Sequence, residues 1–209
     1  IAIQQRPKLY ESIGMIYAAN SINDQASRLG LEIDAFDLYS CFPAAVKMFS
    51  KSLNLDSAIP KTITGSMPYA GGPLNSFVLH STIKMIEKIR NSEVTYGLVT
   101  GVSGMMTKQS FCIWGKSYSE QFILDDVSKQ AKISEIPVEL SKISEGEGEI
   151  IGYTVFEESK NILKAVLYLE DEVKHRKVVS TRDKNFISLL KEEEWVGKRV
   201  KFKNGQVVH

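Results

Sequence analysis

The chain has 209 residues, of which 43% are hydrophobic and 24% charged, a composition typical of a soluble globular protein. Its formal net charge of +1 gives no overall field that would favour nucleic acid or a membrane surface. No apolar run approaches the roughly 18–20 residues that a membrane span needs, and two cysteines and three unclustered histidines indicate neither a disulfide framework nor a metal site. The low number of cysteines favours a reducing cytoplasm as the location. The sequence begins at Ile1 without Met and without an apolar signal core, so we expect a piece of a longer chain.

Helical and strand patterns alternate over the first 115 residues. Apolar residues at i, i+4 spacing predict a helix over Leu9–Leu29, with Gly30 as its C-cap. A short strand follows at Ile33–Leu38. The later elements that we expect are the helix Pro43–Leu53, an extended piece Thr62–Thr64, the helix Asn75–Arg90, and buried strands Val94–Val102 and Lys108–Trp114. This alternation predicts a layered α/β core.

Residues 116–147 are polar, with isolated apolar residues and one short helical pattern at Asp125–Ala131. The Gly- and Glu-rich stretch Ser144–Glu149 reads as the end of a linker. We therefore expect an α/β domain over residues 1–115, a linker over 116–147 and a second domain over 148–209.

The last sixty residues are rich in strand patterns. The turn signal Asn204-Gly205 predicts a hairpin close to the C-terminus. The expected elements are strands Ile150–Glu157, Ile162–Leu169, Arg176–Thr181, Val196–Lys203 and Gln206–Val208, with one helix over Asp183–Leu190. Five strands and a helix of this size suit a small β-barrel of the OB type.

Two segments carry the functional signal: Asp37–Pro43, directly after the first strand, and Thr64–Asn75, which is rich in Gly and Pro. Loops at strand and helix ends are where α/β proteins build their sites. Together the two segments resemble the C-terminal half of the thiolase superfamily. Tyr39-Ser40-Cys41-Phe42 is similar to the block that reads Asn-Glu-Ala-Phe or His-Asp-Cys-Phe in thiolases. Gly71-Gly72-Pro73 is similar to the Gly-His-Pro loop.

The resemblance implies half of a five-layer thiolase core followed by the additional C-terminal domain of proteins labelled acetyl-CoA acetyltransferases. It extends over most of residues 1–115 and weakly over 150–209. In that family a nucleophilic Cys takes the acyl group as a thioester, a second Cys and a His move protons, and oxyanion holes stabilise the intermediates. The nucleophile belongs to the N-terminal half, which this sequence does not contain.

The family's remaining catalytic groups are depleted here. Gly72 stands where the family has the His of Gly-His-Pro, and Tyr39 where it has the Asn or His that orders a water. The segment Val99–Gly104 has no Cys where many thiolases place the second one. Loss of one oxyanion donor typically costs about 2.7–4 kcal/mol of transition-state stabilisation, so this chain alone is expected to have no thiolase turnover.

Three side chains are candidates to replace the lost groups. Cys41 sits at a strand–helix junction, where amide donors can lower a thiol pKa. His80 lies about a turn and a half into the helix that follows the glycine loop, where it could be a relocated base. Tyr39 precedes Cys41 by two residues, so both point to one face of an extended segment. Core packing of Cys41 and Tyr39, and a simple helix-surface role for His80, are the alternative interpretations.

The other residues that the resemblance places at the acyl-CoA site are Phe42, Gly71, Gly72, Pro73 and Asn75. The resemblance implies no permanently bound cofactor, with coenzyme A or an acyl-CoA as substrate or ligand. The expected function is that of the C-terminal portion of a thiolase-like acetyl-CoA acetyltransferase performing Claisen-type acyl transfer.

Two other functions remain open. The chain could be a non-catalytic acyl-CoA-binding, lipid-binding or scaffold subunit that works with a partner, with a second copy, or with the missing N-terminal half. The basic run from Lys198 to Lys203 on an OB module could instead bind single-stranded nucleic acid. The aromatic residues do not interleave with these basic residues, and the net charge is close to zero, which disfavours this third function.

Overall fold

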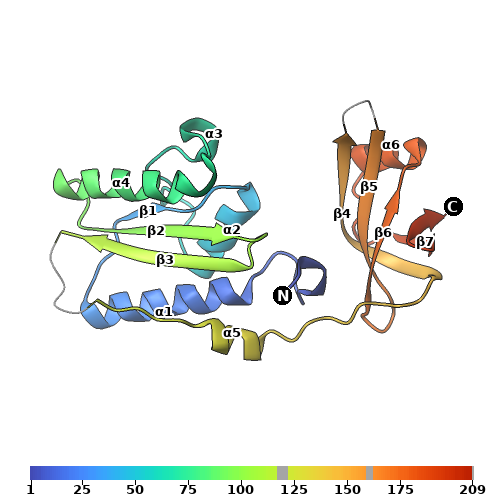
Figure 1. Ribbon diagram of the computed structural model, residues 1–209, viewed down its shortest axis with the longest axis horizontal. Coiled ribbons are helices and arrows are strands. Elements are labelled where there is room, and N and C mark those ends of the chain that lie inside the picture. Colours follow the sequence, from blue (N-terminus) through green and yellow to red (C-terminus); the bar gives the residue numbers. More distant parts are fainter. Residues whose placement is uncertain (117–121, 159–161, 209) are drawn as a thin grey trace. The chain divides into compact units, whose positions relative to one another are not determined.

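The computed structural model describes residues 1–116, 122–158 and 162–208. Chain contacts divide it into two units, shown in Figure 1. The α/β unit is Lys8–Ile136, and the barrel unit combines Ile1–Pro7 with Pro137–His209. The expected linker is therefore divided: residues 122–136 belong to the α/β unit, residues 137–147 belong to the barrel unit, and residues 117–121 lie outside the described part.

The α/β unit is built on a mixed three-stranded sheet in the order β1-β2-β3. Strand β1 is parallel to β2, and β2 is antiparallel to β3. The strands are β1 (Ala35–Asp37), β2 (Tyr96–Ser103) and β3 (Lys108–Gly115), and the helical elements are α1 (Ile13–Leu29), α2 (Pro43–Ser52), α3 (Met67–Ala70), the 3₁₀ turn η2 (Leu74–Ser76), α4 (Phe77–Arg90) and α5 (Ser128–Ser134). The predicted α/β class is confirmed.

Helices cover both faces of this sheet, as Figure 1 shows for α1 on one side and α4 on the other. Side chains alternate along a strand, so Phe36 and Leu98 pack with Met15 and Phe49 from α1 and α2. The opposite face packs against α4. There Ala35 and Val99 of the sheet form a buried cluster with Met85 and Ile89 of α4. The sheet is therefore a buried layer, and its strand ends are left to form a site.

Several element bounds differ from the predicted ones for local reasons. Helix α1 begins at Ile13 rather than at Leu9, because the Ser12 hydroxyl accepts a hydrogen bond from the Met15 amide and caps the helix. Helix α4 begins at Phe77, because the preceding residues form the 3₁₀ turn η2. The predicted extended piece at Thr62–Thr64 does not form a strand of the sheet.

The barrel unit is a closed five-stranded barrel in the order β4-β5-β6-β8-β7. Neighbouring strands are antiparallel except β6 and β8, which are parallel. Its elements are the 3₁₀ turn η1 (Ile3–Gln5), strands β4 (Glu145–Glu158), β5 (Ile162–Glu170) and β6 (Arg176–Thr181), helix α6 (Lys184–Glu192), and strands β7 (Arg199–Lys203) and β8 (Gln206–Val208).

The prediction that Ser144–Glu149 ends a linker is wrong, because Glu145–Glu149 is the first part of β4 and pairs with β7. The glycines in this stretch serve close packing rather than flexibility. A Cβ on Gly148 would lie 3.0 Å from the Cβ of Leu169, and one on Gly146 would lie 3.3 Å from the ring of Phe202. Glycine in a strand often marks such a tight bend at a barrel corner.

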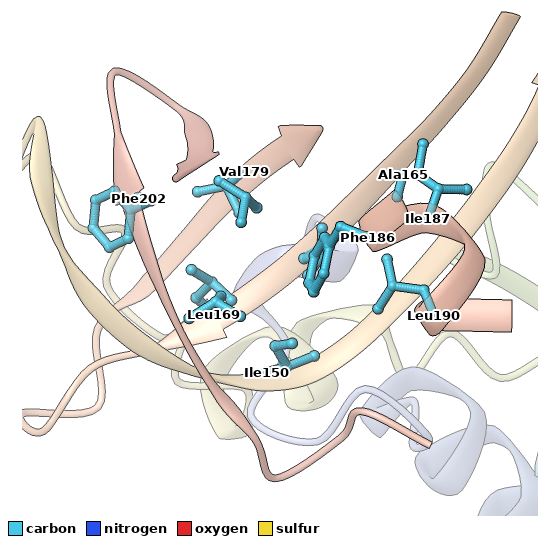
Figure 2. Close-up of a cluster of buried hydrophobic side chains, with 11 residues drawn as sticks. Ile150, Ala165, Leu169, Val179, Phe186, Ile187, Leu190 and Phe202 are labelled. Carbon is cyan, nitrogen blue, oxygen red and sulfur yellow. The ribbon is translucent and has the colours of Figure 1, made fainter. Parts of the chain in front are cut away.

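One apolar cluster fills the barrel (Figure 2). Strand residues Ile150, Leu169, Val179 and Phe202 point into it, and Figure 2 shows helix α6 adding Phe186, Ile187 and Leu190. The Phe186 ring meets Trp195 edge to face, with 4.9 Å between the ring centroids. Because the helix closes the cluster, the barrel interior is a packed core rather than a ligand cavity.

The N-terminal segment Ile1–Pro7 is held on the barrel unit by Arg176, which is only 4% exposed. The Arg176 guanidinium donates from Nη2 to the carbonyl of Pro7 (2.8 Å) and from Nη1 to the carbonyls of Gln4 (3.3 Å) and Arg6. The chain therefore passes between the two units twice, after Pro7 and after residue 136.

Candidate functional site

A buried carboxylate organises the end of β1. Asp37 is 1% exposed, and its oxygens accept hydrogen bonds from the hydroxyls of Thr62 (3.1 Å), Thr64 (3.0 Å) and Ser81 (2.8 Å). The backbone amides of Ile63 (2.9 Å) and Thr64 (3.0 Å) donate to it as well. Asp37 thus ties the start of the glycine loop and helix α4 to the sheet.

The turn between β1 and α2 is fixed by two further hydrogen bonds. The Tyr39 amide donates to the hydroxyl of Thr100 on β2 (2.9 Å), and the Ser40 hydroxyl accepts from the Met67 amide at the start of α3 (3.0 Å). The Tyr39 ring packs edge to face on Phe77, with 5.7 Å between centroids. These contacts hold the Tyr39–Phe42 turn against the sheet and α4.

A cleft of about 520 Å³ opens beside this turn. Tyr39, Cys41 and Phe42 form one wall, Asn75 comes from the turn η2, and Val78 comes from the start of α4. The β2–β3 hairpin supplies the third wall through residues 101–106 and 108–110. The volume lies within the roughly 300–1,000 Å³ of small-molecule sites.

Two titratable side chains, those of Tyr39 and Cys41, line the cleft. Burial raises the pKa of the Cys41 thiol, and the amides of Phe42 and Cys41 that point at the sulfur offset only part of this rise. Burial also raises the pKa of the Tyr39 phenol, and the neighbouring Cys41 adds to it. The expectation of a lowered thiol pKa is therefore wrong, because burial outweighs the amide donors. At neutral pH both groups are protonated hydrogen-bond donors.

The glycine loop lies outside the cleft lining, apart from Asn75. Gly71, Gly72 and Pro73 are exposed, and Gly71 adopts a φ of 79°, which favours glycine. A Cβ on Gly72 would lie 3.2 Å from the sulfur of Met67, so this glycine packs against α3. The structure therefore brings together Tyr39, Cys41, Phe42 and Asn75, without these three loop residues.

His80 also lies outside the cleft lining. It is exposed on α4, and its ring is 6.5 Å from that of Phe77, on which Tyr39 packs. The structure therefore places His80 beside Phe77 and not in the cleft lining with Cys41.

From the sequence, Val99–Gly104 was considered only for its missing Cys, and the rest of the hairpin wall, Met105 to Ser110, was not assigned to the site. The backbone of this hairpin is unusual, because Gly104 (φ 58°), Met105 (φ 53°) and Met106 (φ 60°) are all left-handed. Residues held in this region commonly occur at functional sites. The glycines in the segment Thr100–Lys108 were the available signal, whereas two left-handed methionines are not indicated by residue type.

The α/β unit and the barrel unit together define a thiolase-like fold. The chain superposes with a TM-score of 0.86 on the crystal structure of a monomeric SCP2-thiolase-like protein type 1 from Mycobacterium smegmatis. The match covers 100% of this chain at 22% sequence identity, and the chain spans 48% of the length of that protein. No protein-family model and no curated protein matches the sequence.

The described residues include neither a membrane-spanning helix nor a metal-binding cluster. None of their helices is long and apolar enough to cross a membrane. Over residues 1–116, 122–158 and 162–208, His, Cys, Asp and Glu side chains do not gather into a group that could hold a metal ion.

Proposed function

We propose that this chain is the C-terminal portion of a thiolase-like protein that binds the acyl end of an acyl-CoA in the cleft beside Cys41. The observation that carries the proposal is the cleft itself. On a thiolase-like fold, the Tyr39–Phe42 turn and Asn75, both assigned to the acyl-CoA site by resemblance, line one hollow with the β2–β3 hairpin.

The chemistry of the cleft favours binding over catalysis. A thiol attacks as its thiolate, and the raised pKa of Cys41 keeps it protonated at neutral pH. The Cys41 thiol and the Tyr39 hydroxyl can instead donate hydrogen bonds to a thioester carbonyl. Gly72 provides no side-chain donor in place of the family's His. We therefore propose a protein with altered or absent Claisen-type acyl transfer, and no thiolysis of acetoacetyl-CoA by this chain alone.

The outer face of α4 supports the proposal that another part of a longer chain covers this unit. Leu79 (60% exposed) and Ile83 (56%) lie one helical turn apart on that face, and Leu74 (88%) and Tyr69 (88%) are exposed close to it in sequence. Contiguous exposed apolar patches on soluble proteins commonly mark interaction sites. This chain spans 48% of the length of the M. smegmatis protein. We propose that a counterpart of the remaining part of that protein covers the outer face of α4 here.

We propose further that the barrel is of the OB type. The strand order β4-β5-β6-β8-β7, the parallel β6–β8 pair and a helix between β6 and β7 support this assignment. Its basic strand β7 supports no nucleic-acid function, because Lys203 pairs with Glu145 (2.9 Å) and Arg199 pairs with Glu147 (2.8 Å) on β4. A structural or docking role for the barrel fits these paired charges.

The proposal is tested by calorimetric titration of coenzyme A and acetyl-CoA into the wild-type chain and two variants. Ser103→Trp places an indole at the end of β2 in the cleft lining, and Ser57→Trp adds the same group to an exposed loop outside it. We expect binding to the wild type and to Ser57→Trp, and at least about tenfold weaker binding to Ser103→Trp, equivalent to about 1.4 kcal/mol. Equal affinity for all three proteins would contradict the assignment of the cleft.

A further inference from the structure

A single side chain supplies the charge of the cleft. Among the residues around it, Lys108 is the one with an ionic side chain. Lys108 is the first residue of β3 and lies opposite Ser103 across the hairpin. Other lysines of the α/β unit form ion pairs, as Lys51 does with Glu11 at 2.7 Å. Within the described ranges no carboxylate forms an ion pair with Lys108, so its ammonium group is available to a ligand.

The rest of the cleft is mainly apolar and large. Val78, Val102, Met105 and Met106 line it, and the unbranched methionine side chains adapt to irregular hydrocarbon shapes. A water-sized group takes about 30 Å³ of liquid volume, so an acetyl group of three heavy atoms fills on the order of 100 Å³. The cleft of about 520 Å³ therefore has room for a chain several times longer than acetyl.

We infer that the cleft takes a medium-chain hydrocarbon group that ends in a carboxylate, with the chain along Val102, Met105 and Met106 and the carboxylate on Lys108. This inference deepens the proposed function and rests on it, since it specifies the acyl group bound there. A lysine ammonium recognises an anion as a flexible point charge. Two sources share this chemistry: a free fatty acid, and an acyl-CoA whose acyl chain ends in a second carboxyl group.

The test uses decanoate below its micellar concentration, with decanol as the uncharged match and acetate as the ligand without a chain. Each is titrated calorimetrically into the wild-type chain, Lys108→Met and Lys116→Met. Lys116 follows the far end of β3, where its ammonium group donates to the hydroxyl of Ser92 (3.2 Å), and it is outside the cleft lining. Methionine keeps most of the lysine stem and removes its charge.

We expect decanoate to bind the wild type at least about tenfold more tightly than decanol or acetate. Lys108→Met should abolish the preference for decanoate over decanol, and Lys116→Met should keep it. Added salt should weaken decanoate binding to the wild type, because an exposed ammonium is screened. Equal binding of decanoate and decanol to the wild type, or equal losses in both lysine variants, would overturn the inference.

Two thioesters distinguish a free fatty acid from an acyl-CoA as the ligand. They also distinguish failure of the proposed acyl-CoA binding from failure of the carboxylate site at Lys108. If the ligand is an acyl-CoA, the half thioester of decanedioic acid with coenzyme A binds more tightly than decanoyl-CoA, and Lys108→Met removes the difference. If the ligand is a free acid, the two thioesters bind equally and decanoate alone depends on Lys108. Loss of all coenzyme A binding with retained Lys108-dependent decanoate binding would overturn the proposed function and leave the carboxylate site standing.

Discussion

Replacing Arg176 by Leu removes the guanidinium that holds Ile1–Pro7 on the barrel unit. Three carbonyl oxygens, those of Gln4, Arg6 and Pro7, lose a charged donor. Each hydrogen bond to a charged group contributes about 1.5–3 kcal/mol. The sum overstates the effect, because the buried charge itself costs desolvation free energy and the three bonds share one donor group.

The Arg176 Nε also lies 3.6 Å from a carboxylate oxygen of Glu170. We therefore expect Arg176→Leu to lower the free energy of unfolding of the barrel unit by about 3–5 kcal/mol, the usual cost of removing one partner of a buried ion pair. The assay is urea denaturation monitored by Trp195 fluorescence, since Trp195 packs on Phe186 in the barrel core. A Trp114→Phe background removes the tryptophan of the α/β unit. Such a loss is large against the roughly 5–15 kcal/mol stability of a typical domain.

Two controls distinguish the loss of the contact between Arg176 and Ile1–Pro7 from a general effect of losing an arginine. Arg199→Leu removes an exposed arginine that pairs with Glu147 on the barrel surface, and it should leave the midpoint almost unchanged. A chain that lacks residues 1–7 should already be destabilised, and Arg176→Leu should then add little. A loss below about 1 kcal/mol in the full chain, or full additivity of the two changes, would refute the reasoning.

Two further predictions concern the α/β unit. A Cβ on Gly97 would lie 1.9 Å from the sulfur of buried Met85, so Gly97→Ala should lower the free energy of unfolding, measured by urea denaturation, by about 1–3 kcal/mol. An added Met85→Val change should restore part of this loss, and no recovery would mean that the clash is elsewhere. The pKa of Cys41 lies above its ordinary value of 9.0 because of burial, so its thiolate fraction at pH 8 is smaller than that of a free thiol. In a background without the other cysteine, alkylation of Cys41 should be slower than that of a model thiol at pH 8 and should rise with pH beyond 9.0; a rate plateau near neutral pH would contradict the raised pKa.

Much of the fold could be predicted because the patterns are local. Strands β5 and β6 and helix α6 follow their apolar periodicity closely. The bounds of β6 are those predicted, and the bounds of β5 and α6 differ from the predicted ones by one or two residues. The first part of β4, Glu145–Glu149, was not predicted as strand. Its glycines at positions 146 and 148 read as a flexible linker, although they allow close packing in the barrel. The attachment of Ile1–Pro7 to the barrel depends on Arg176, some 170 residues away, and a contact at that sequence distance leaves no periodic signal.

The site was predictable in part, from the resemblance of two segments to a known family. The Tyr39–Phe42 turn and Asn75 were singled out by resemblance, and they line the cleft. Gly71 to Pro73 were expected there too, yet the bonds of Asp37 to Thr62, Ile63 and Thr64 fix only the start of that loop against the sheet, and the three residues lie outside the lining. The hairpin wall depends on the left-handed backbone at Met105 and Met106, which the residue types do not reveal.

The central claim is that the cleft beside Cys41 is the ligand site of this thiolase-like chain. Its most direct test is a methyl NMR titration of the methionines with coenzyme A and acetyl-CoA. We predict that the signals of Met105 and Met106 in the cleft wall shift saturably, while that of Met85, buried between α4 and the sheet, stays in place. Saturable shifts that spare Met105 and Met106, or no shift of any methionine at saturating ligand, would contradict the account.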